Sequence, residues 1–276
     1  MHMKSILFGS KGYLGQHFLR RFPESVCPSI DIADVRAVSA LFDTEQPDIV
    51  INAAGKTGTP NVDWCEDHRA ETLHANVTGP LVLVEECAKR GIYLVHLSSG
   101  CIYAGENSGA GYGEDDEPNF SGSFYSRTKA WSEQILKEFP DTLIVRLRMP
   151  FDGSMNPKNL IMKVRAFSRV NDVKNSITYV PDFINATAQL IEKRKSGIYN
   201  IVNPGSVSPY EIVELYTDIV DPSHSAERVS MDQLSGLSKA GRSNCVLNTQ
   251  KLENEGIRLM PVQEALRKAL EEIAEG

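Results

Sequence analysis

Residues 5–15 read Ser5-Ile6-Leu7-Phe8-Gly9-Ser10-Lys11-Gly12-Tyr13-Leu14-Gly15, and this stretch decides the fold. Its first four residues form an apolar run, and residues 16–22 continue with helical periodicity. A strand, a glycine turn and a helix together give the context of a dinucleotide-binding turn, because glycines let backbone N–H groups approach a pyrophosphate at a helix N-terminus. The spacing is G-x-x-G-x-x-G, not the commoner G-x-G-x-x-G. Glycines that serve only a tight turn are the alternative.

Further apolar runs alternate with helical segments along the chain. Residues 48–55, 93–99 and 142–148 predict buried strands, and residues 81–90 predict a helix between the first two. This alternation predicts an α/β protein with a doubly wound parallel sheet of Rossmann type. We expect an NAD(P)-binding domain over 1–150, to which 176–203 returns, and a small C-terminal substrate-binding lobe made of 151–175 and 204–276.

Two segments beyond the strands have specific expectations. Residues 155–167 are expected to form a helix that lines the site. Residues 105–117 are rich in Gly, Asp and Glu and are expected to form a mobile loop near the site that acts as a lid.

The composition excludes several classes of protein. The 276 residues carry a net charge of −7 and no basic run, which argues against nucleic acid as a partner. No apolar stretch is long enough for a membrane span, and the chain enters a strand at once, so we expect a cytoplasmic protein without a membrane partner. The five cysteines and six histidines are scattered, which favours reduced thiols and predicts no metal site.

Tyr125 and Lys129 lie four apart in a segment with helical character, so both are expected on one helix face. An ammonium beside a phenol stabilises the phenolate, so we expect Lys129 to lower the pKa of Tyr125 and make it an acid or base near neutrality. The Ser99 hydroxyl would hold a carbonyl oxygen against that phenol. Asn52, Ser99 and residues 148–150 all follow strands, and the carboxyl ends of parallel strands form the ligand-binding edge of such sheets.

The second strand of the nucleotide fold is poorly marked. Asp31 lies about fifteen residues after Gly15 and could be mistaken for the acid that binds a ribose diol. We instead interpret Asp31 and Ile32 as part of the loop after that strand, where they would border the adenine. The choice between NADH and NADPH is left open by the sequence.

With these pieces assembled, the chain resembles the extended short-chain dehydrogenase/reductases. More narrowly, it resembles the nucleotide-sugar 4-ketoreductases that make rhamnose, including their bifunctional 3,5-epimerase/4-reductase members. The segments that carry the resemblance are 52–55, 60–66, 100–102, 118–126, 146–150, 156–159, 203–205 and 242–244.

The resemblance implies a reductase triad of Ser99, Tyr125 and Lys129. Tyr125 would protonate the C4 oxygen as hydride arrives from NADPH, or from NADH, and Lys129 would hold the ribose hydroxyls. The residues implied to line the cofactor, beside Asp31, Ile32, Tyr125 and Lys129, are Gly9, Ser10, Lys11, Gly12, Tyr13, Leu14, Asn52, Ala53, Ala54 and Asn76.

The bifunctional members also imply an acid/base pair for epimerisation, matched here by Cys101 and Lys163. A C4 ketone acidifies the protons at C3 and C5, so a base on one face and an acid on the other can invert each centre through an enolate. A small packed thiol and a solvated lysine are the alternative interpretations of the two side chains.

Several residues are candidates for binding the nucleotide-diphosphate 4-keto-6-deoxy sugar. Trp64 and Phe124 would flank the sugar or simply pack, and Asn61 and Asp63 are suited to its hydroxyls. Arg242 would bind the diphosphate in bidentate fashion, or form a surface ion pair. The remaining substrate-binding candidates are Ser99 and Asn159.

Three functions are compatible with these features. The first is 3,5-epimerisation and 4-reduction of an NDP-4-keto-6-deoxyglucose to NDP-β-L-rhamnose. The second is reduction alone, and the third is a non-catalytic NAD(P)-binding regulatory subunit. The sequence does not identify the nucleotide or the oligomeric state, and a homodimer is compatible with it.

Overall fold

The computed structural model describes residues 3–234 and 238–276. Its centre is a parallel sheet in the order β1-β2-β3-β4-β8. These strands are β1 (Ser5–Phe8), β2 (Ile49–Asn52), β3 (Tyr93–Ser99), β4 (Thr142–Leu147) and β8 (Gly197–Asn200). Strands β1 to β4 are buried along their whole length, which explains their nearly continuous apolar sequences.

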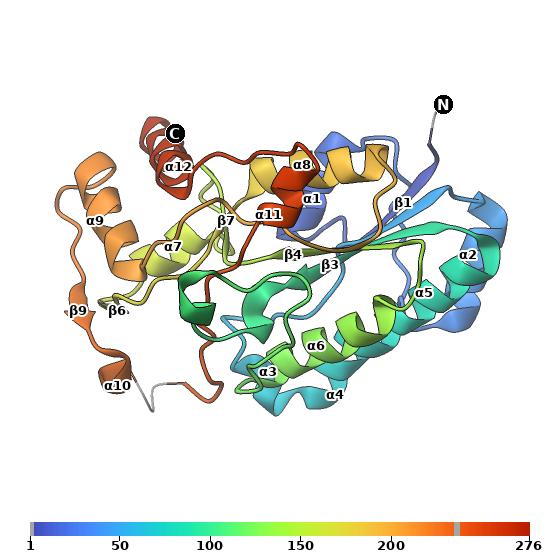
Figure 1. Ribbon diagram of the computed structural model, residues 1–276, viewed down its shortest axis with the longest axis horizontal. Helices are drawn as coiled ribbons and strands as arrows, with labels where there is room; N and C mark the ends of the chain where they lie inside the picture. The colour runs from blue at the N-terminus through green and yellow to red at the C-terminus, as the bar shows by residue number, and fades with distance from the viewer. Residues whose placement is uncertain (1–2, 235–237) are drawn as a thin grey trace.

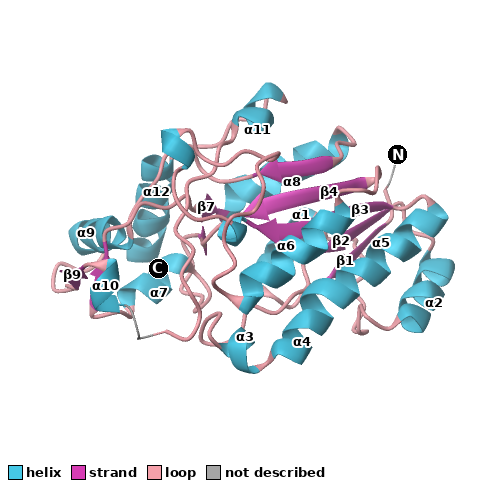
Figure 2. Ribbon diagram, turned by 60° about the horizontal axis from the view of Figure 1, so that its bottom comes forward, coloured by secondary structure: helices cyan, strands magenta, loops and turns pink. Residues whose placement is uncertain are grey.

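Helices cover both faces of this sheet (Figures 1 and 2). On one face lie α1 (Tyr13–Arg21) and α8 (Val180–Glu192), whose Phe18 and Phe183 meet edge to face. On the other face lie α2 (Val35–Glu45), α5 (Gly79–Arg90) and α6 (Phe124–Leu136). The predicted doubly wound α/β fold is confirmed.

A second apolar core belongs to the C-terminal part of the chain, at the left of Figure 1. It brings together Ile161, Ile212 and Leu266 from three helices. The elements around it are β5 (Pro150–Phe151), α7 (Leu160–Arg165), β6 (Arg169–Asn171), β7 (Thr178–Tyr179), α9 (Pro209–Ile219), β9 (Glu227–Val229), α10 (Met231–Leu234) and α12 (Val262–Glu275). We refer to this part as the lobe.

The remaining short elements lie around the carboxyl edge of the sheet, except α11, which packs beside β8. They are α3 (Trp64–Asp67), α4 (Arg69–Leu73), the π-type turn η1 (His74–Thr78), the 3₁₀ turns η2 (Gly100–Ile102) and η3 (Asn107–Gly109), and α11 (Gln250–Asn254). No helix in the described residues has the length and apolar character needed to cross a bilayer.

Two expected elements are shorter than the sequence suggested. The helix expected over 155–167 is limited to α7, because Asn159 caps it by accepting a hydrogen bond from the Ile161 N–H (3.0 Å). The second strand of the nucleotide fold is reduced to a single parallel bridge between Ile6 and Val26. Residues 27–34 then form a loop that ends at Asp34, the N-cap of α2.

The loop 105–117 is held by hydrogen bonds to two other parts of the chain, and its role as a lid stays a prediction. The N–H groups of Gly105 and Tyr112 donate to the carbonyls of Asn244 and Val246. Arg146, beneath the loop, donates to the carbonyl oxygens of Gly113 and Glu114. These contacts tie the loop to the sheet and to residues 244–248, so opening it would break several hydrogen bonds at once.

Candidate active site

A cavity of about 660 Å³ lies at the carboxyl ends of β1 and β2. Asp31 and Ile32 line it together with Gly9, Ala54 and Lys56. Asp31 also meets His74 at 2.7 Å, and this hydrogen bond lowers the pKa of the Asp31 carboxyl. The loop that contains Asp31 and Ile32 therefore lies beside the glycine turn, and both line the same cavity. This is the arrangement that the sequence interpretation of Asp31 and Ile32 requires.

The glycine turn, Gly9 to Leu14, has the shape of an anion cradle. Gly9 has φ +76°, and the Gly12 N–H donates to the Gly9 carbonyl (2.9 Å). A Cβ on Gly15 would lie 2.0 Å from that same carbonyl oxygen, so only glycine allows α1 to start so close to the turn. No side chain caps α1 and no acid lies in its first turn, which leaves its N-terminal N–H groups available to a phosphate. These features fit a dinucleotide.

The loop after β2 is held by buried amides. Asn76 in η1 is buried, and its side-chain amide forms two hydrogen bonds with the backbone of Lys56. It accepts from the Lys56 N–H (2.7 Å) and donates to the Lys56 carbonyl (2.9 Å). The Asn52 side chain accepts from the Ala54 N–H (3.1 Å). Ala53 and Ala54 lie directly beside Gly9. A Cβ on Gly9 would lie 2.6 Å from the Ala53 carbonyl carbon, so no larger residue fits there.

Helix α6 places Tyr125 and Lys129 on its inner face. It starts there because Ser123 caps it, accepting from the Ser126 N–H (3.0 Å). The expectation that Lys129 lowers the pKa of Tyr125 is wrong for this structure. Burial raises the pKa of the Tyr125 phenol above its usual range, and the Ser99 hydroxyl beside it offsets this only in part. The phenol is therefore protonated at neutral pH.

Lys129 points into the sheet instead, toward a histidine that the sequence analysis missed. Its Nζ donates to the Leu97 carbonyl (2.7 Å) and lies 3.4 Å from His96 Nε2. The other ring nitrogen, Nδ1, faces Asn52 Nδ2 at 3.1 Å. Residues 52 and 96 are direct neighbours in the β2–β3 ladder, which explains how positions so far apart in sequence meet.

The donor and acceptor in each of these hydrogen bonds can be assigned from the Ala54 N–H. The Ala54 N–H can only donate, so Asn52 Oδ1 faces it and Nδ2 donates to His96 Nδ1. Burial, and then Lys129, lower the pKa of His96, so the ring is neutral and carries its proton on Nε2. That N–H faces Lys129 Nζ, which disfavours an ammonium there. Burial lowers the pKa of Lys129 to about 8, in the same direction.

Ser99 and Cys101 adjoin one another where β3 ends. The Cys101 N–H donates to Ser99 Oγ (3.2 Å), and the thiol is partly exposed. Its sulfur accepts from Nη1 of Arg148 (3.4 Å), another residue whose role the sequence analysis did not recognise. Ser99, Cys101, Tyr125 and Lys129 thus gather at one edge of the sheet.

Lys163 lies apart from this group, on α7 in the lobe. Its side chain is exposed, and desolvation by its neighbours together with Lys158 lowers its pKa. No hydrogen bond joins it to Cys101 among the described residues. Its place as the acid partner of Cys101 stays a prediction.

The candidate substrate residues fall into two groups. Asp63 accepts from Arg242 (3.0 Å) and from the Ala240 N–H (3.0 Å), so Arg242 is in an ion pair here. Asn61 accepts from the Asp63 N–H (2.8 Å), and Trp64 stacks on His68 with centroids 3.9 Å apart. The contacts of Asp63 bring the start of α3 and the segment 238–244 together.

Phe124 and Asn159 are buried. Phe124 packs edge to face against Trp131. The Asn159 side chain donates to the carbonyls of Asp152 and Ser154 and accepts from the Ile161 N–H at the start of α7. These contacts do not support a direct role for Asn159 in binding a ligand, and that role stays a prediction.

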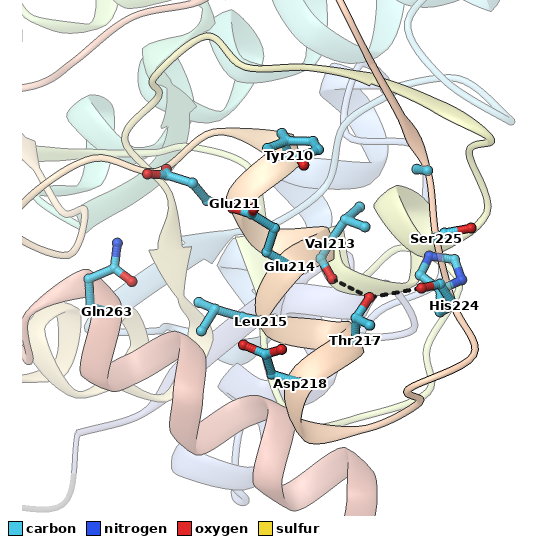
Figure 3. Close-up of a pocket in the computed structure, with 11 residues that line it drawn as sticks. Tyr210, Glu211, Val213, Glu214, Leu215, Thr217, Asp218, His224, Ser225 and Gln263 are labelled. Carbon is cyan, nitrogen blue, oxygen red and sulfur yellow. Dashed lines mark hydrogen bonds between the residues drawn. The ribbon is translucent and has the colours of Figure 1, made fainter.

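A separate groove of about 520 Å³ lies in the lobe (Figure 3). Glu211, Glu214 and Asp218 give it a negative lining, and Thr217 donates to the Val213 carbonyl within it. None of the predicted site residues lies there. Its charge makes it unsuited to a sugar diphosphate.

The parallel sheet, the glycine cradle and the Ser-Tyr-Lys edge define a nucleotide-binding α/β protein of the short-chain dehydrogenase/reductase type. Over residues 3–275 the chain matches the family described as RmlD substrate binding domain, and it belongs to that family. The resemblance drawn from its motifs is confirmed.

Named relatives fall in rhamnose biosynthesis. A bifunctional dTDP-4-dehydrorhamnose 3,5-epimerase/dTDP-4-dehydrorhamnose reductase of Arabidopsis thaliana is 39% identical over 86% of this chain and 81% of its own length. A trifunctional UDP-glucose 4,6-dehydratase/UDP-4-keto-6-deoxy-D-glucose 3,5-epimerase/UDP-4-keto-L-rhamnose-reductase of the same plant is 34% identical over 96% of this chain, which spans 41% of that longer protein.

Solved structures share the fold closely. The L780 UDP-rhamnose synthase of Acanthamoeba polyphaga mimivirus superimposes with a TM-score of 0.93 at 32% identity, covering 99% of this chain and 100% of that one. A dTDP-4-dehydrorhamnose reductase of Bacillus anthracis, solved in complex with NADP, gives 0.85 at 23% identity and covers 99% of each chain.

Proposed function

We propose that this protein is a bifunctional NDP-4-keto-6-deoxy-D-glucose 3,5-epimerase/4-ketoreductase that uses NADPH and forms NDP-β-L-rhamnose. The observation that carries the proposal is the gathering of Ser99, Tyr125, Lys129 and Cys101 at one edge of the sheet. The relatives named above, which include an epimerase/reductase and a UDP-rhamnose synthase, support it.

The cofactor would lie along the carboxyl edge, with its pyrophosphate on the glycine cradle and its adenine near Asp31 and Ile32. When bound there, it supplies the hydride for C4 of the sugar. Ser99 Oγ would orient the C4 oxygen, and the Tyr125 phenol would donate its proton to it. Because burial keeps that phenol protonated, Tyr125 is prepared to act as an acid, which is the role that reduction requires.

Lys129, one helical turn after Tyr125, would hold the ribose hydroxyls of the cofactor. With its pKa near 8, both the ammonium and the amine are populated near neutrality. The Leu97 carbonyl accepts a hydrogen bond from Lys129 Nζ and so fixes the position of the side chain.

Epimerisation would precede reduction while C4 is still a ketone. Cys101 would remove the proton from C5 or C3 to give an enolate, and an acid on the opposite face would return a proton with inverted configuration. Lys163 is the candidate acid. Its exposure on α7 favours reduction alone as the second candidate function.

Two reactions, each followed with its own signal, test the proposal. Tyr125→Phe should lower NADPH oxidation by about 10²- to 10⁴-fold, the usual contribution of a general acid, while deuterium exchange from solvent at C3 and C5 persists. Cys101→Ala should lose the exchange but still reduce a ketone that has already been epimerised. Unchanged exchange in Cys101→Ala would assign Cys101 to packing, and no NADPH oxidation by the wild type would reject the reductase.

A further inference from the structure

Arg148, directly after β4, is a buried cation without a carboxylate partner. Its side chain is only 1% exposed, and no Asp or Glu in the described residues forms an ion pair with it. Arg146, two residues earlier and equally buried, has such a partner in Glu133 at 2.6 Å. An uncompensated buried charge is unfavourable, so the surroundings of Arg148 should contain a group that can become its counter-ion.

The contacts of Arg148 identify that group. Nη2 donates to Asn175 Oδ1 (2.5 Å) and to the Ser243 carbonyl, and Nη1 donates to Ser243 Oγ (3.1 Å). These acceptors are neutral and cannot ionise. The remaining acceptor is Cys101 Sγ, 3.4 Å from Nη1, and a thiol can lose its proton.

A second cysteine near Arg148 is less suited to carry the charge. Cys245 is fully buried, and its Sγ donates to the Gly100 carbonyl (3.2 Å), which requires the protonated form. Burial raises the pKa of Cys245, and Arg148 only partly offsets this. Cys101, by contrast, is partly exposed to the site and donates no hydrogen bond through its sulfur in the described structure.

We propose that Arg148 is the counter-ion of a Cys101 thiolate and thereby positions the base for epimerisation. The inference rests on the role given to Cys101 in the proposed function. Arg148 is buried and contacts the partly exposed sulfur, and it acts through that sulfur as a positioning residue. The thiolate takes a proton from the carbon beside the C4 ketone, giving a neutral thiol and a sugar enolate, and no further reactant is needed.

The location couples the base to the reductive site. The Cys101 N–H donates to Ser99 Oγ, the hydroxyl proposed to orient the ketone. The titratable and charged groups that face the thiol are Arg148 after β4, Tyr125 and Lys129 on α6, and Cys245 in the C-terminal segment. Arg148 is the one among them that remains charged at every accessible pH.

Alkylation of the full chain by iodoacetamide, without cofactor or substrate, tests this pairing directly. Peptide mapping by mass spectrometry follows Cys101, and the exposed Cys27 serves as an internal standard. In Arg148→Met the alkylation rate of Cys101 at pH 7 should fall about tenfold or more, because the thiolate loses its counter-ion. A tenfold change corresponds to about 1.4 kcal/mol. Raising the pH should restore the rate, because the thiolate then forms without its partner. Arg148→Lys, which keeps a cation, should recover part of the rate at pH 7.

Two further variants control for folding and for general charge effects. Asn175→Asp leaves Arg148 in place but offers its guanidinium a competing carboxylate, so Cys101 alkylation should slow as well. Lys239→Gln removes a positive charge from the same C-terminal segment, but Asp67 is the partner of Lys239 (2.6 Å), so the rate should stay unchanged. Equal Cys101 rates in the wild type, Arg148→Met and Asn175→Asp would overturn the pairing.

The same variants separate this inference from the proposed function. Arg148→Met should also slow deuterium exchange at C3 and C5, with partial recovery in Arg148→Lys. A slower alkylation with unchanged exchange would overturn the role in epimerisation and leave the ion pair standing. Absent exchange in the wild type, with the alkylation pattern as expected, would reject the epimerase alone.

Discussion

Lys129 offers a quantitative test, because its burial should make the protein without cofactor more stable when the lysine is removed. The side chain is 5% exposed, and burial lowers its pKa from 10.5 to about 8. At about 1.4 kcal/mol for each pH unit, this difference corresponds to about 3 kcal/mol. We therefore expect Lys129→Met to be more stable than the wild type in neutral solution, while losing reductase activity.

The pH window follows from the sign of the change. Below pH 8 Lys129 is protonated in both the folded and the unfolded chain, and its burial is fully unfavourable. Between pH 8 and 10.5 the unfolded chain binds the proton and the folded chain does not, so the wild type gains stability as the pH rises. The stability difference between Lys129→Met and the wild type should thus shrink by about 3 kcal/mol across this window.

Urea denaturation at several pH values from 7 to 10.5 measures this difference, and comparing two variants cancels the titration of the other groups. Lys137→Met is the matched control, since Lys137 is exposed at the end of the same helix. It should change stability little and with no dependence on pH. A stability difference for Lys129→Met that stays constant over the whole range would refute the reasoning.

Two other predictions concern the sheet and the glycine turn. Glu133→Gln should destabilise the protein by about 3–5 kcal/mol in urea denaturation, because it leaves buried Arg146 unpaired. Replacing Glu133 by Leu and Arg146 by Met together should cost less than the sum of the two single changes. Simple additivity would contradict this. Gly15→Ala should abolish NADPH binding in a fluorescence titration, because its Cβ would lie 2.0 Å from the Gly9 carbonyl oxygen. Gly113→Ala, with 3.8 Å of clearance, should bind normally, and unimpaired binding by Gly15→Ala would contradict the cradle geometry.

Periodic patterns in the sequence predicted the elements that are buried on both faces. The run at 93–99 corresponds residue for residue to β3, a central parallel strand that is buried along its whole length. The helix expected over 155–167 was too long because α7 begins only after Asn159, whose side chain caps it. The strand reduced to the Ile6–Val26 bridge has too little apolar sequence to be recognised.

The chemistry of the site was harder to predict than its location. The position of Tyr125 and Lys129 on one helix suggested a direct effect of the lysine on the phenol, but burial dominates both groups. His96 and Arg148 were missed because their partners come from other parts of the chain. Asn52 is 44 residues from His96, and Ser243 is 95 residues from Arg148. Local spacing carries no signal for such pairs.

The hydrogen bonds between loop 105–117 and residues 244–248 have a consequence for the order in which parts of the protein fold during translation. The sheet strands β1 to β4 leave the ribosome first, but the partners of Gly105 and Tyr112, and one partner of Arg148, lie within residues 243–246. A nascent chain that ends before residue 243 has its nucleotide cradle but lacks the contacts that complete the region around Cys101. Such a chain should bind a dinucleotide before it can act on a sugar, so the cofactor is available as a folding ligand during synthesis.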